Sequence, residues 1–224
     1  MELNKYIDHT NLKPYTTKEN IEKLCNEAVE YGFASVCVNP YYVKLASELL
    51  KDTNIAVCTV IGFPLGQNTT DVKEFEAINA IQNGADEIDM VINIGALKDK
   101  KYDYVKKEIE TIRDSIDGKI LKIIIETCYL TEEEIAKMTE ICNETFVNFI
   151  KTSTGFGTRG VSLEDMKIIN EHKMDYLEVK ASGGIKNYSD ATSFIEAGAT
   201  RLGTSSGIEI MNSCNNKNCK CEEE

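Results

Sequence analysis

The stretch Phe146-Val-Asn-Phe-Ile-Lys-Thr-Ser-Thr-Gly155 leads a short apolar segment into Lys151 and then into a loop of small residues. The chain repeats this pattern once, because Tyr176-Leu-Glu-Val-Lys180 is followed by Ala181-Ser-Gly-Gly184. A short apolar segment that ends at small residues predicts a buried strand. The sequence therefore predicts two buried strands, each with a lysine where the backbone turns into a loop.

A lysine at the end of a buried strand has chemical consequences, because burial disfavours its ammonium form. A neutral amine then becomes accessible near neutral pH, and this amine is a nucleophile that forms Schiff bases with carbonyl compounds. A single lysine of this kind more often extends past the strand end into solvent. The repeated pattern makes the catalytic interpretation more favourable than the solvent-exposed one. A second ammonium at Lys180 would repel the charge on Lys151 and so further favour the neutral amine of Lys151.

Short apolar segments alternate with helical patterns along the whole chain. Eight strands are predicted, at residues 6–10, 33–38, 55–61, 87–92, 120–126, 146–151, 176–180 and 200–204. Several of the intervening helices begin at capping signatures: Thr16-Thr-Lys-Glu19, Thr131-Glu-Glu-Glu134 and Ser162-Leu-Glu-Asp165. This alternation predicts a single-domain α/β protein with the (β/α)8 TIM-barrel fold. The alternative, an open doubly wound sheet, would need a Gly-x-Gly-x-x-Gly turn after an early strand, which the sequence lacks.

Composition limits the domain organisation and the partners. The 224 residues, 42% of them hydrophobic, can form one sizeable core, and the barrel is predicted to cover residues 1–212. Residues 213–224 are predicted to be a polar, cysteine-containing, disordered tail. The formal net charge of −12 argues against nucleic acid and anionic membranes as partners. The sequence has no membrane-length apolar run and no signal-peptide pattern, which predicts a cytoplasmic protein.

The cysteines and histidines argue against a metal centre. Only two histidines are present, and no paired Cys-x-x-Cys motif occurs, so neither a metal ion nor another cofactor is expected. Five cysteines lie in apolar patterns and are predicted to be buried free thiols of a reducing compartment: Cys25, Cys37, Cys58, Cys128 and Cys142.

Polar residues near strand ends are the candidates for chemistry, because the active site of a (β/α)8 barrel lies at the C-terminal ends of its strands. Asp89 lies between Ile88 and Met90, in a predicted strand of mostly apolar residues. It is either a structural ion-pair partner of Lys122 or a proton-transfer group at the barrel mouth. Asp8, Thr10 and Lys122 are candidates for a supporting role around the catalytic residues.

Glycine and serine residues follow the seventh and eighth predicted strands, in Gly183-Gly184 and in Gly203-Thr-Ser-Ser-Gly207. Barrel enzymes often bind phosphate with the loops after these two strands and a helix N-terminus. Glycines let backbone amides approach an anion closely, and Ser205 and Ser206 can donate hydrogen bonds. These loops therefore predict a phosphate site.

These segments resemble those of the deoxyribose-phosphate aldolase family. The motifs are Ile7-Asp-His-Thr10, Cys58-Thr-Val-Ile-Gly-Phe-Pro64, Asp86-Glu-Ile-Asp89, Lys151-Thr-Ser-Thr-Gly-Phe156, Val179-Lys-Ala-Ser-Gly-Gly184 and Gly203-Thr-Ser-Ser-Gly207. The resemblance extends over nearly the whole chain. It implies a class I aldolase on a (β/α)8 barrel that reversibly cleaves 2-deoxy-D-ribose 5-phosphate to acetaldehyde and D-glyceraldehyde 3-phosphate.

The resemblance also implies roles for individual residues. Lys151 would be the Schiff-base lysine, and Asp89 and Lys180 would be the proton-transfer pair. The phosphate end would be lined by Gly155, Gly183, Gly184, Gly203, Ser205 and Ser206. The expected partners are a sugar phosphate and aldehydes, and a homodimer is left open. The imine on Lys151 is expected to act as an electron sink while the C3–C4 bond of the sugar breaks.

The sequence departs from the family pattern at a few positions. Arg159 and Val161-Ser162 occupy the loop after Lys151, where glycine and Ala-Thr are more common, and Lys186 replaces a common arginine. The C-terminal segment lacks the tyrosine that reaches the active site in some members. Two alternatives therefore stay open: a Schiff-base barrel enzyme for another phosphorylated carbonyl compound, and a non-catalytic phosphate-binding barrel.

Overall fold

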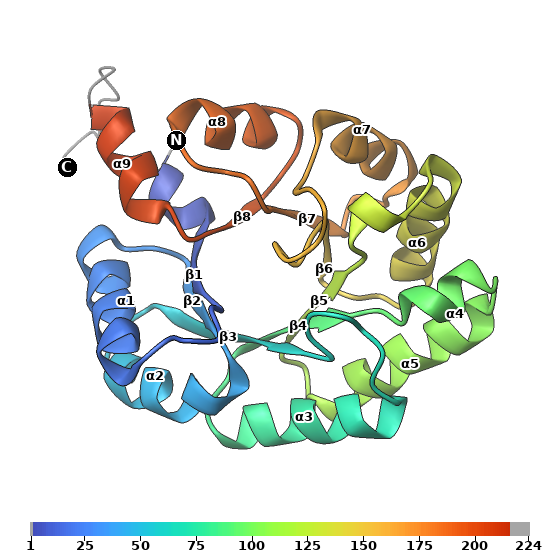
Figure 1. The fold of residues 1–224 in the computed structure, drawn as a ribbon, viewed down its shortest axis with the longest axis horizontal. Coiled ribbons are helices and arrows are strands. Elements are labelled where there is room, and N and C mark those ends of the chain that lie inside the picture. The colour runs from blue at the N-terminus through green and yellow to red at the C-terminus, as the bar shows by residue number, and fades with distance from the viewer. Residues whose placement is uncertain (1, 216–224) are drawn as a thin grey trace.

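The computed structural model describes residues 2–215, and these form a closed barrel of parallel strands surrounded by helices (Figure 1). The strands pair in sequence order, and the eighth closes onto the first. They are β1 (Ile7–Asn11), β2 (Ser35–Val38), β3 (Ala56–Ile61), β4 (Glu87–Val91), β5 (Ile120–Ile124), β6 (Phe149–Lys151), β7 (Glu178–Ser182) and β8 (Arg201–Thr204). The predicted (β/α)8 fold is confirmed, and the open-sheet alternative is wrong.

Helices follow the strands and cover the outside of the barrel (Figure 1). They are α1 (Lys18–Tyr31), α2 (Val43–Leu50), α3 (Thr70–Gln82), α4 (Ile94–Lys98), α5 (Tyr102–Ser115), α6 (Glu132–Glu144), α7 (Leu163–His172), α8 (Tyr188–Glu196) and α9 (Gly207–Asn215). Short 3-10 helices occur at Leu3–Tyr6, Pro40–Tyr42 and Thr127–Tyr129. Capping boxes begin α6 at Thr131 and α7 at Ser162, as predicted, whereas α1 is capped by Thr17 with Asn20.

The segment Phe146–Gly155 contains a shorter strand than predicted, β6. Phe146 has a φ of 52°, is 71% exposed and stacks on Tyr176, so it belongs to the turn before β6. In contrast, β7 starts at Glu178 and continues past Lys180. As a result, Lys151 ends its strand, whereas Lys180 lies in the middle of the neighbouring one.

Side-chain alternation separates the apolar core from the polar barrel interior. Successive residues of a strand point to opposite faces of the sheet. One set is apolar, fully buried and part of the main core: Ile88, Ile123, Ile150 and Val179. The residues next to them in sequence carry charge and are also buried: Asp89, Lys122, Lys151 and Lys180. The core therefore lies between strands and helices, and the charged groups meet inside the barrel.

The C-terminal helix extends past the predicted barrel boundary at residue 212. Within α9, the Ser213 hydroxyl accepts a hydrogen bond from the Tyr188 backbone N–H at 3.1 Å, which ties α9 to the start of α8. The predicted disordered tail lies mostly at residues 216–224, outside the described residues.

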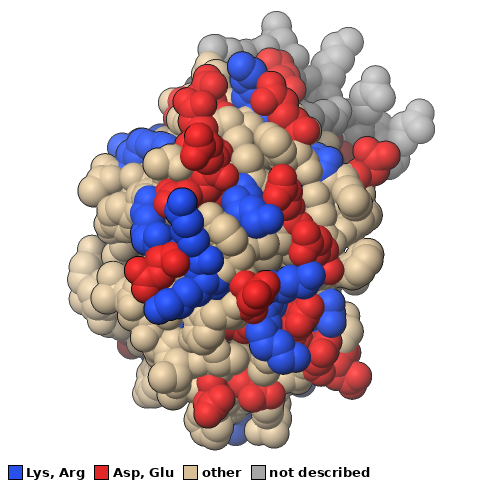
Figure 2. All heavy atoms as spheres, turned by 90° about the vertical axis from the view of Figure 1, so that its right-hand side faces the viewer, with Lys and Arg blue, Asp and Glu red and all other residues tan. Residues whose placement is uncertain are grey.

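The surface over α4, α5 and α6 carries interspersed positive and negative side chains (Figure 2). Ion pairs join these helices, with Lys98 2.5 Å from Glu134 and Lys106 2.7 Å from Glu144. This face therefore lacks the single-sign basic patch that a nucleic-acid footprint needs. Within residues 2–215, no helix has the length and apolar content that crossing a membrane requires.

Candidate active site

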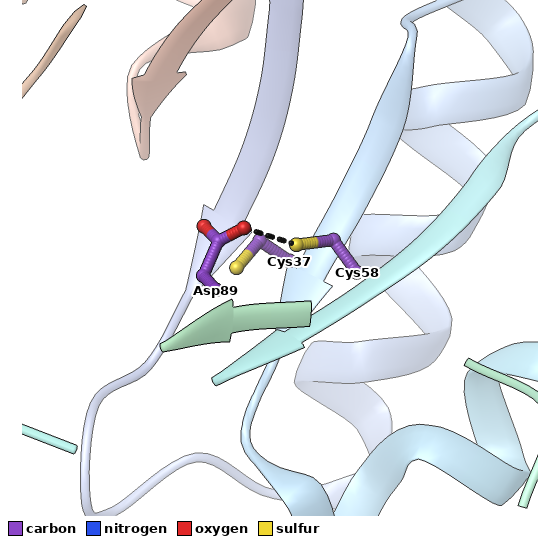
Figure 3. Close-up of side chains that lie close together, drawn as sticks. All are labelled: Cys37, Cys58 and Asp89. Atoms are coloured by element: carbon purple, nitrogen blue, oxygen red, sulfur yellow. Dashed lines mark hydrogen bonds between the residues drawn. The ribbon is translucent and has the colours of Figure 1, made fainter. Parts of the chain in front are cut away.

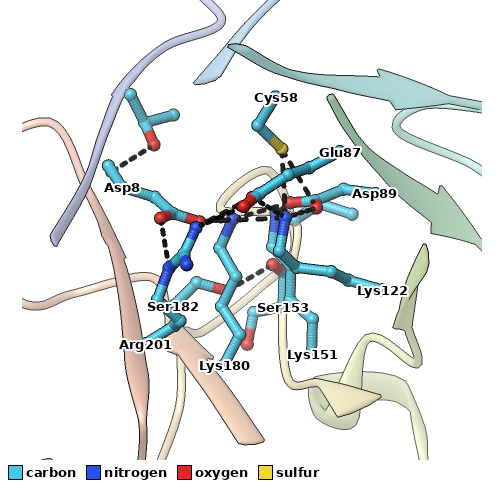
Figure 4. Close-up of polar contacts among 12 residues, drawn as sticks. Asp8, Cys58, Glu87, Asp89, Lys122, Lys151, Ser153, Lys180, Ser182 and Arg201 are labelled. Carbon is cyan, nitrogen blue, oxygen red and sulfur yellow. Dashed lines mark hydrogen bonds and ion pairs between the residues drawn. The ribbon is translucent and has the colours of Figure 1, made fainter. Parts of the chain in front are cut away.

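Charged side chains from several strands converge inside the barrel (Figure 4), and Asp89 contacts three lysines there. Its Oδ2 accepts hydrogen bonds from Lys151 at 2.8 Å and from Lys180 at 2.7 Å, and its Oδ1 accepts one from Lys122 at 2.8 Å. Strand register explains the convergence, because Asp89 is aligned with Lys122 and Lys151 with Lys180. Both interpretations of Asp89 thus keep support, since it pairs with Lys122 and also contacts the two other lysines.

The lysines hold Asp89 in its ionised form. Burial by itself would raise the pKa of this carboxyl group. The charges of Lys122, Lys151 and Lys180 outweigh burial and hold the pKa of Asp89 well below its usual range. Asp89 is therefore a carboxylate that accepts hydrogen bonds from three ammonium groups.

Lys180 is fully buried between two carboxylates. Its Nζ lies 2.5 Å from Asp8 and 2.7 Å from Asp89. Burial opposes the ammonium form, but the two carboxylates outweigh it and raise the pKa of Lys180 above its ordinary value. Gly203 leaves room for this side chain, since a Cβ at that position would lie 3.1 Å from the Lys180 Cε.

Lys151 differs from the two other lysines in its surroundings. Among the described residues, its ammonium forms an ion pair with a single carboxylate, Asp89, whereas Lys122 and Lys180 each contact more than one. Lys151 also lines a cavity of about 450 Å³ at the barrel mouth, and the two other lysines do not. Lys151 is thus the lysine that a molecule in this cavity can reach.

The same cavity gathers the predicted phosphate-binding residues. Its lining includes Thr10 and all six residues of that set: Gly155, Gly183, Gly184, Gly203, Ser205 and Ser206. Both serines immediately precede α9, so the cavity lies beside a helix N-terminus, where anions are stabilised. Two loops come into close contact at Gly160 and Gly183. The contact requires glycine at position 160, since a Cβ there would lie 2.0 Å from the Gly183 carbonyl oxygen.

The structure separates two of the departures from the family pattern, Lys186 and Arg159. Lys186 lines the cavity and is exposed, beside the predicted phosphate-binding residues Gly183 and Gly184. Arg159 is not among the cavity-lining residues; it forms a bidentate pair with Asp165 at 2.6 and 2.9 Å. Asp165 also completes the capping box of α7, so Arg159 ties the loop after β6 to that helix.

Sequence reasoning missed several residues around the site. Arg201 contacts Asp8 at 2.7 Å and Glu87 at 2.8 Å, and Glu87 contacts Lys122 at 2.5 Å. Arg201 and Glu87 stand at the first positions of β8 and β4, so the rule that favours strand ends passed over them. A charged residue opening an otherwise buried strand was the available signal.

Other missed residues lie on the cavity wall near α1. His9 contacts Glu27 at 2.8 Å, and Glu27 is 3.6 Å from Lys23. Lys13 and Lys23 line the cavity as well, so several cations surround the space next to the predicted phosphate loops.

Two thiols lie next to the charged cluster. The ligand atoms of Cys37, Cys58 and Asp89 are within 4.8 Å of one another (Figure 3), as are those of Asp8, Cys58 and Glu87. The Cys58 thiol donates to Asp89 at 3.2 Å, and burial raises its pKa well above the ordinary value. Because ammonium groups already contact Asp89, a metal ion would meet positive charge there, and the absence of a metal site stays a prediction.

The remaining cysteines differ in burial. Cys25 and Cys142 are buried, and burial raises the pKa of Cys25 to about 11. Cys128 is only half-buried, so its predicted burial is wrong; it lies in the 3-10 helix after β5 rather than inside a strand.

The fold and the site together define a (β/α)8 enzyme of the aldolase type, with a buried lysine that opens onto a cavity lined by glycine–serine loops. A family model described as DeoC/LacD family aldolase matches residues 3–213, and the chain belongs to this family. It is similar to the deoxyribose-phosphate aldolase of Thermococcus gammatolerans, with 56% identity over 220 residues that cover 96% of this chain and 98% of the relative. The corresponding Clostridium tetani protein is 57% identical over 212 residues, covering 94% of this chain and 98% of the relative.

Solved structures agree with this assignment. The structure described as "QR15, an Aldolase" superposes with a TM-score of 0.92 at 47% identity, covering 96% of each chain. The deoxyribose phosphate aldolase from Aeropyrum pernix, described as having a unique tetrameric structure, superposes with a TM-score of 0.89 at 31% identity. That match covers 95% of this chain and 91% of the other. The resemblance inferred from the motifs is therefore confirmed.

Proposed function

We propose that this chain is a deoxyribose-phosphate aldolase, which reversibly cleaves 2-deoxy-D-ribose 5-phosphate to acetaldehyde and D-glyceraldehyde 3-phosphate through a Schiff base on Lys151. The observation that carries the proposal is that one cavity holds both the reachable lysine and the glycine–serine loops. A phosphorylated aldehyde sugar needs both features, an amine for its carbonyl end and an anion site for its phosphate end. The relatives named deoxyribose-phosphate aldolase support the same substrate.

The reaction begins when the neutral amine of Lys151 attacks the open-chain aldehyde carbon, C1. Loss of water gives a protonated imine, which withdraws electrons from the neighbouring carbon, C2. The C3 hydroxyl group then loses its proton and becomes the aldehyde of glyceraldehyde 3-phosphate. The electrons of the C2–C3 bond move into the imine and form an enamine.

The expectation that the C3–C4 bond breaks is wrong. Acetaldehyde contains two carbons, C1 and C2, so the bond that breaks must be C2–C3. Only this cleavage leaves the electron pair on the carbon next to the imine, where the imine can accept it. Protonation of C2 and hydrolysis of the new imine release acetaldehyde and regenerate Lys151.

Asp89 and Lys180 act as the proton-transfer pair in this proposal. Lys180 Nζ and Lys151 Nζ both donate to the same oxygen of Asp89, so this carboxylate links Lys180 to the reacting nitrogen. Lys180 is a fully charged donor while Asp8 and Asp89 hold it. A water in the cavity would carry protons between this pair and the C2 and C3 positions.

Trapping with borohydride tests the proposal. Borohydride reduces an imine but not an amine, so incubation with deoxyribose 5-phosphate should leave a stable adduct that peptide mapping places on Lys151. The Lys151→Met variant should give no adduct and no turnover. An adduct on Lys122 or Lys180 would contradict the assignment of Lys151. Faster turnover of another sugar phosphate would contradict the proposed substrate.

The proposal also covers three further properties of the enzyme: its independence of a metal cofactor, its oligomeric state and its location in the cell. Turnover should continue in EDTA, because the chemistry assigned here uses only lysine and carboxylate groups; loss of activity in EDTA would contradict it. A cytoplasmic location and a homodimer are also proposed. Light scattering would distinguish a dimer from the tetramer described for the Aeropyrum pernix enzyme.

A further inference from the structure

Six charged side chains of the barrel interior form a closed ring in which positive and negative groups alternate (Figure 4). In order around the ring, its members are Arg201, Asp8, Lys180, Asp89, Lys122 and Glu87. Each successive pair is separated by 2.5 to 2.8 Å. Lys151 lies outside the ring and pairs with it through Asp89 at 2.8 Å.

The ring is electrically balanced, and Lys151 is the additional charge. Three cations and three carboxylates alternate in the ring, so its formal charges cancel. Protonated Lys151 leaves one positive charge in excess within a buried network, and loss of its proton leaves the network neutral. The neutral amine is also the form that attacks a carbonyl group.

We infer that Arg201 and Glu87 are positioning residues that close the ring and set the number of charges facing Lys151, so that its Schiff base forms near neutral pH. This inference rests on the proposed function. Neither residue is among those that line the cavity, so both act through their neighbours. Arg201 holds Asp8 against Lys180, and Glu87 holds Lys122 against Asp89.

The link between Arg201 and Glu87 has the geometry of a specific contact. One Arg201 nitrogen lies 2.8 Å from both oxygens of Glu87, while Nε contacts Asp8 at 2.7 Å. A guanidinium group makes the two contacts with separate nitrogens fixed in one plane, whereas a lysine side chain has only one nitrogen to offer both carboxylates. The pKa of Arg201 is raised despite its burial, because Asp8 and Glu87 stabilise the charge.

The pH dependence of Lys151 also involves the other groups around it. The buried titratable groups of the ring and beside it come from the barrel strands: Asp8, Cys37, Cys58, Glu87, Asp89, Lys122, Lys180 and Arg201. Glu126 lies on the loop after β5, and the further charged groups of the cavity are His9, Lys13, Lys23, Glu27 and Lys186. The variants below change two ring members and leave all the others in place.

The test measures the rate of adduct formation on Lys151 with acetaldehyde and cyanoborohydride across a range of pH. Glu87→Gln removes a negative charge, so Lys151 should lose its proton more easily, and the midpoint of the pH profile should move to lower pH. Arg201→Met removes a positive charge and should move the midpoint to higher pH. Each shift should be on the order of one pH unit. The double variant restores the charge balance and should return close to the wild-type midpoint.

Two controls separate charge from structural damage. Arg201→Lys keeps the charge but loses the bridge, so the adduct should form more slowly with an unchanged midpoint. Glu108→Gln makes the same chemical change as Glu87→Gln at a buried carboxylate outside the ring, which pairs with Lys73 at 2.9 Å. It should lower the melting temperature and leave the midpoint unchanged.

Each outcome bears on a definite claim. Midpoint shifts in opposite directions support the inference. Shifts in the same direction, or no shift, overturn the inference. In either case an adduct on the wild-type enzyme leaves the proposed function intact. A wild-type enzyme without an adduct would overturn the proposed function and the inference with it. Should Arg201→Met fail to fold, Glu87→Gln decides by itself, because its amide oxygen can still accept hydrogen bonds from Arg201 and Lys122.

Discussion

Lys180 offers the sharpest test of the proton-transfer step. Replacing it by methionine removes a buried ammonium and roughly keeps the shape of the side chain. We expect kcat to fall roughly 10²- to 10⁴-fold, the range for a general acid–base group, which corresponds to about 3 to 5 kcal/mol of activation free energy. The free energy of unfolding should fall by less than the roughly 3 to 5 kcal/mol typical of a broken buried ion pair. The reason is that Asp8 and Asp89 each keep another cationic partner.

The Lys180→Arg variant separates positive charge from proton transfer. Arginine preserves the charge that faces Asp8 and Asp89 but cannot give up its proton in a protein. Its larger head group must also fit a fully buried site. We therefore expect Lys180→Arg to be about as slow as Lys180→Met.

The assay is the release of glyceraldehyde 3-phosphate from deoxyribose 5-phosphate, with borohydride trapping in parallel to show that the imine still forms. An arginine variant that retains more than roughly a tenth of wild-type kcat would refute proton transfer by Lys180. The double variant with Asp89→Asn should be little slower than the slower single variant, because members of one relay are not additive. Fully additive losses would mean that the two residues act independently.

Three further results are expected. Lys186→Ala should raise KM for deoxyribose 5-phosphate by about tenfold but leave KM for unphosphorylated deoxyribose unchanged, since Lys186 faces the cavity beside the phosphate loops; equal effects on both sugars would contradict this role. Gly160→Ala should destabilise the fold by about 1 to 3 kcal/mol in a denaturant melt, because its Cβ would overlap the Gly183 carbonyl; unchanged stability would show that the loops can separate. Folding lowers the pKa of Asp8 and Asp89, so their contribution to stability is complete above about pH 4 and is lost as the pH falls through their folded values. Melting temperatures should therefore fall in acid, and a smaller fall in Asp89→Asn is the check.

The sequence alone was enough to predict the architecture and to single out Lys151, which the structure places at the cavity. Apolar segments alternating with capped helical segments are local patterns, and each strand and helix is encoded largely within its own residues. The lysine after a buried strand and the glycines after the last two strands are local signals of the same kind. Their meaning depends only on the rule that the strand ends of a barrel meet at one mouth. Strand limits were less predictable, because Phe146 looks like a strand residue and yet occupies an exposed turn.

The contacts between charged groups were decided by the tertiary structure. Arg201 lies 193 residues from Asp8 and 114 residues from Glu87 in sequence, and no local pattern joins such distant positions. They meet because β8 pairs with β1 to close the barrel, and because strand register places alternate side chains at the same depth. The same closure surrounds Asp89 with three lysines and leaves Lys151 as the one that reaches the cavity. The residue types in the sequence indicated that lysine and carboxylate chemistry was available, and barrel closure determined which of these side chains contact one another.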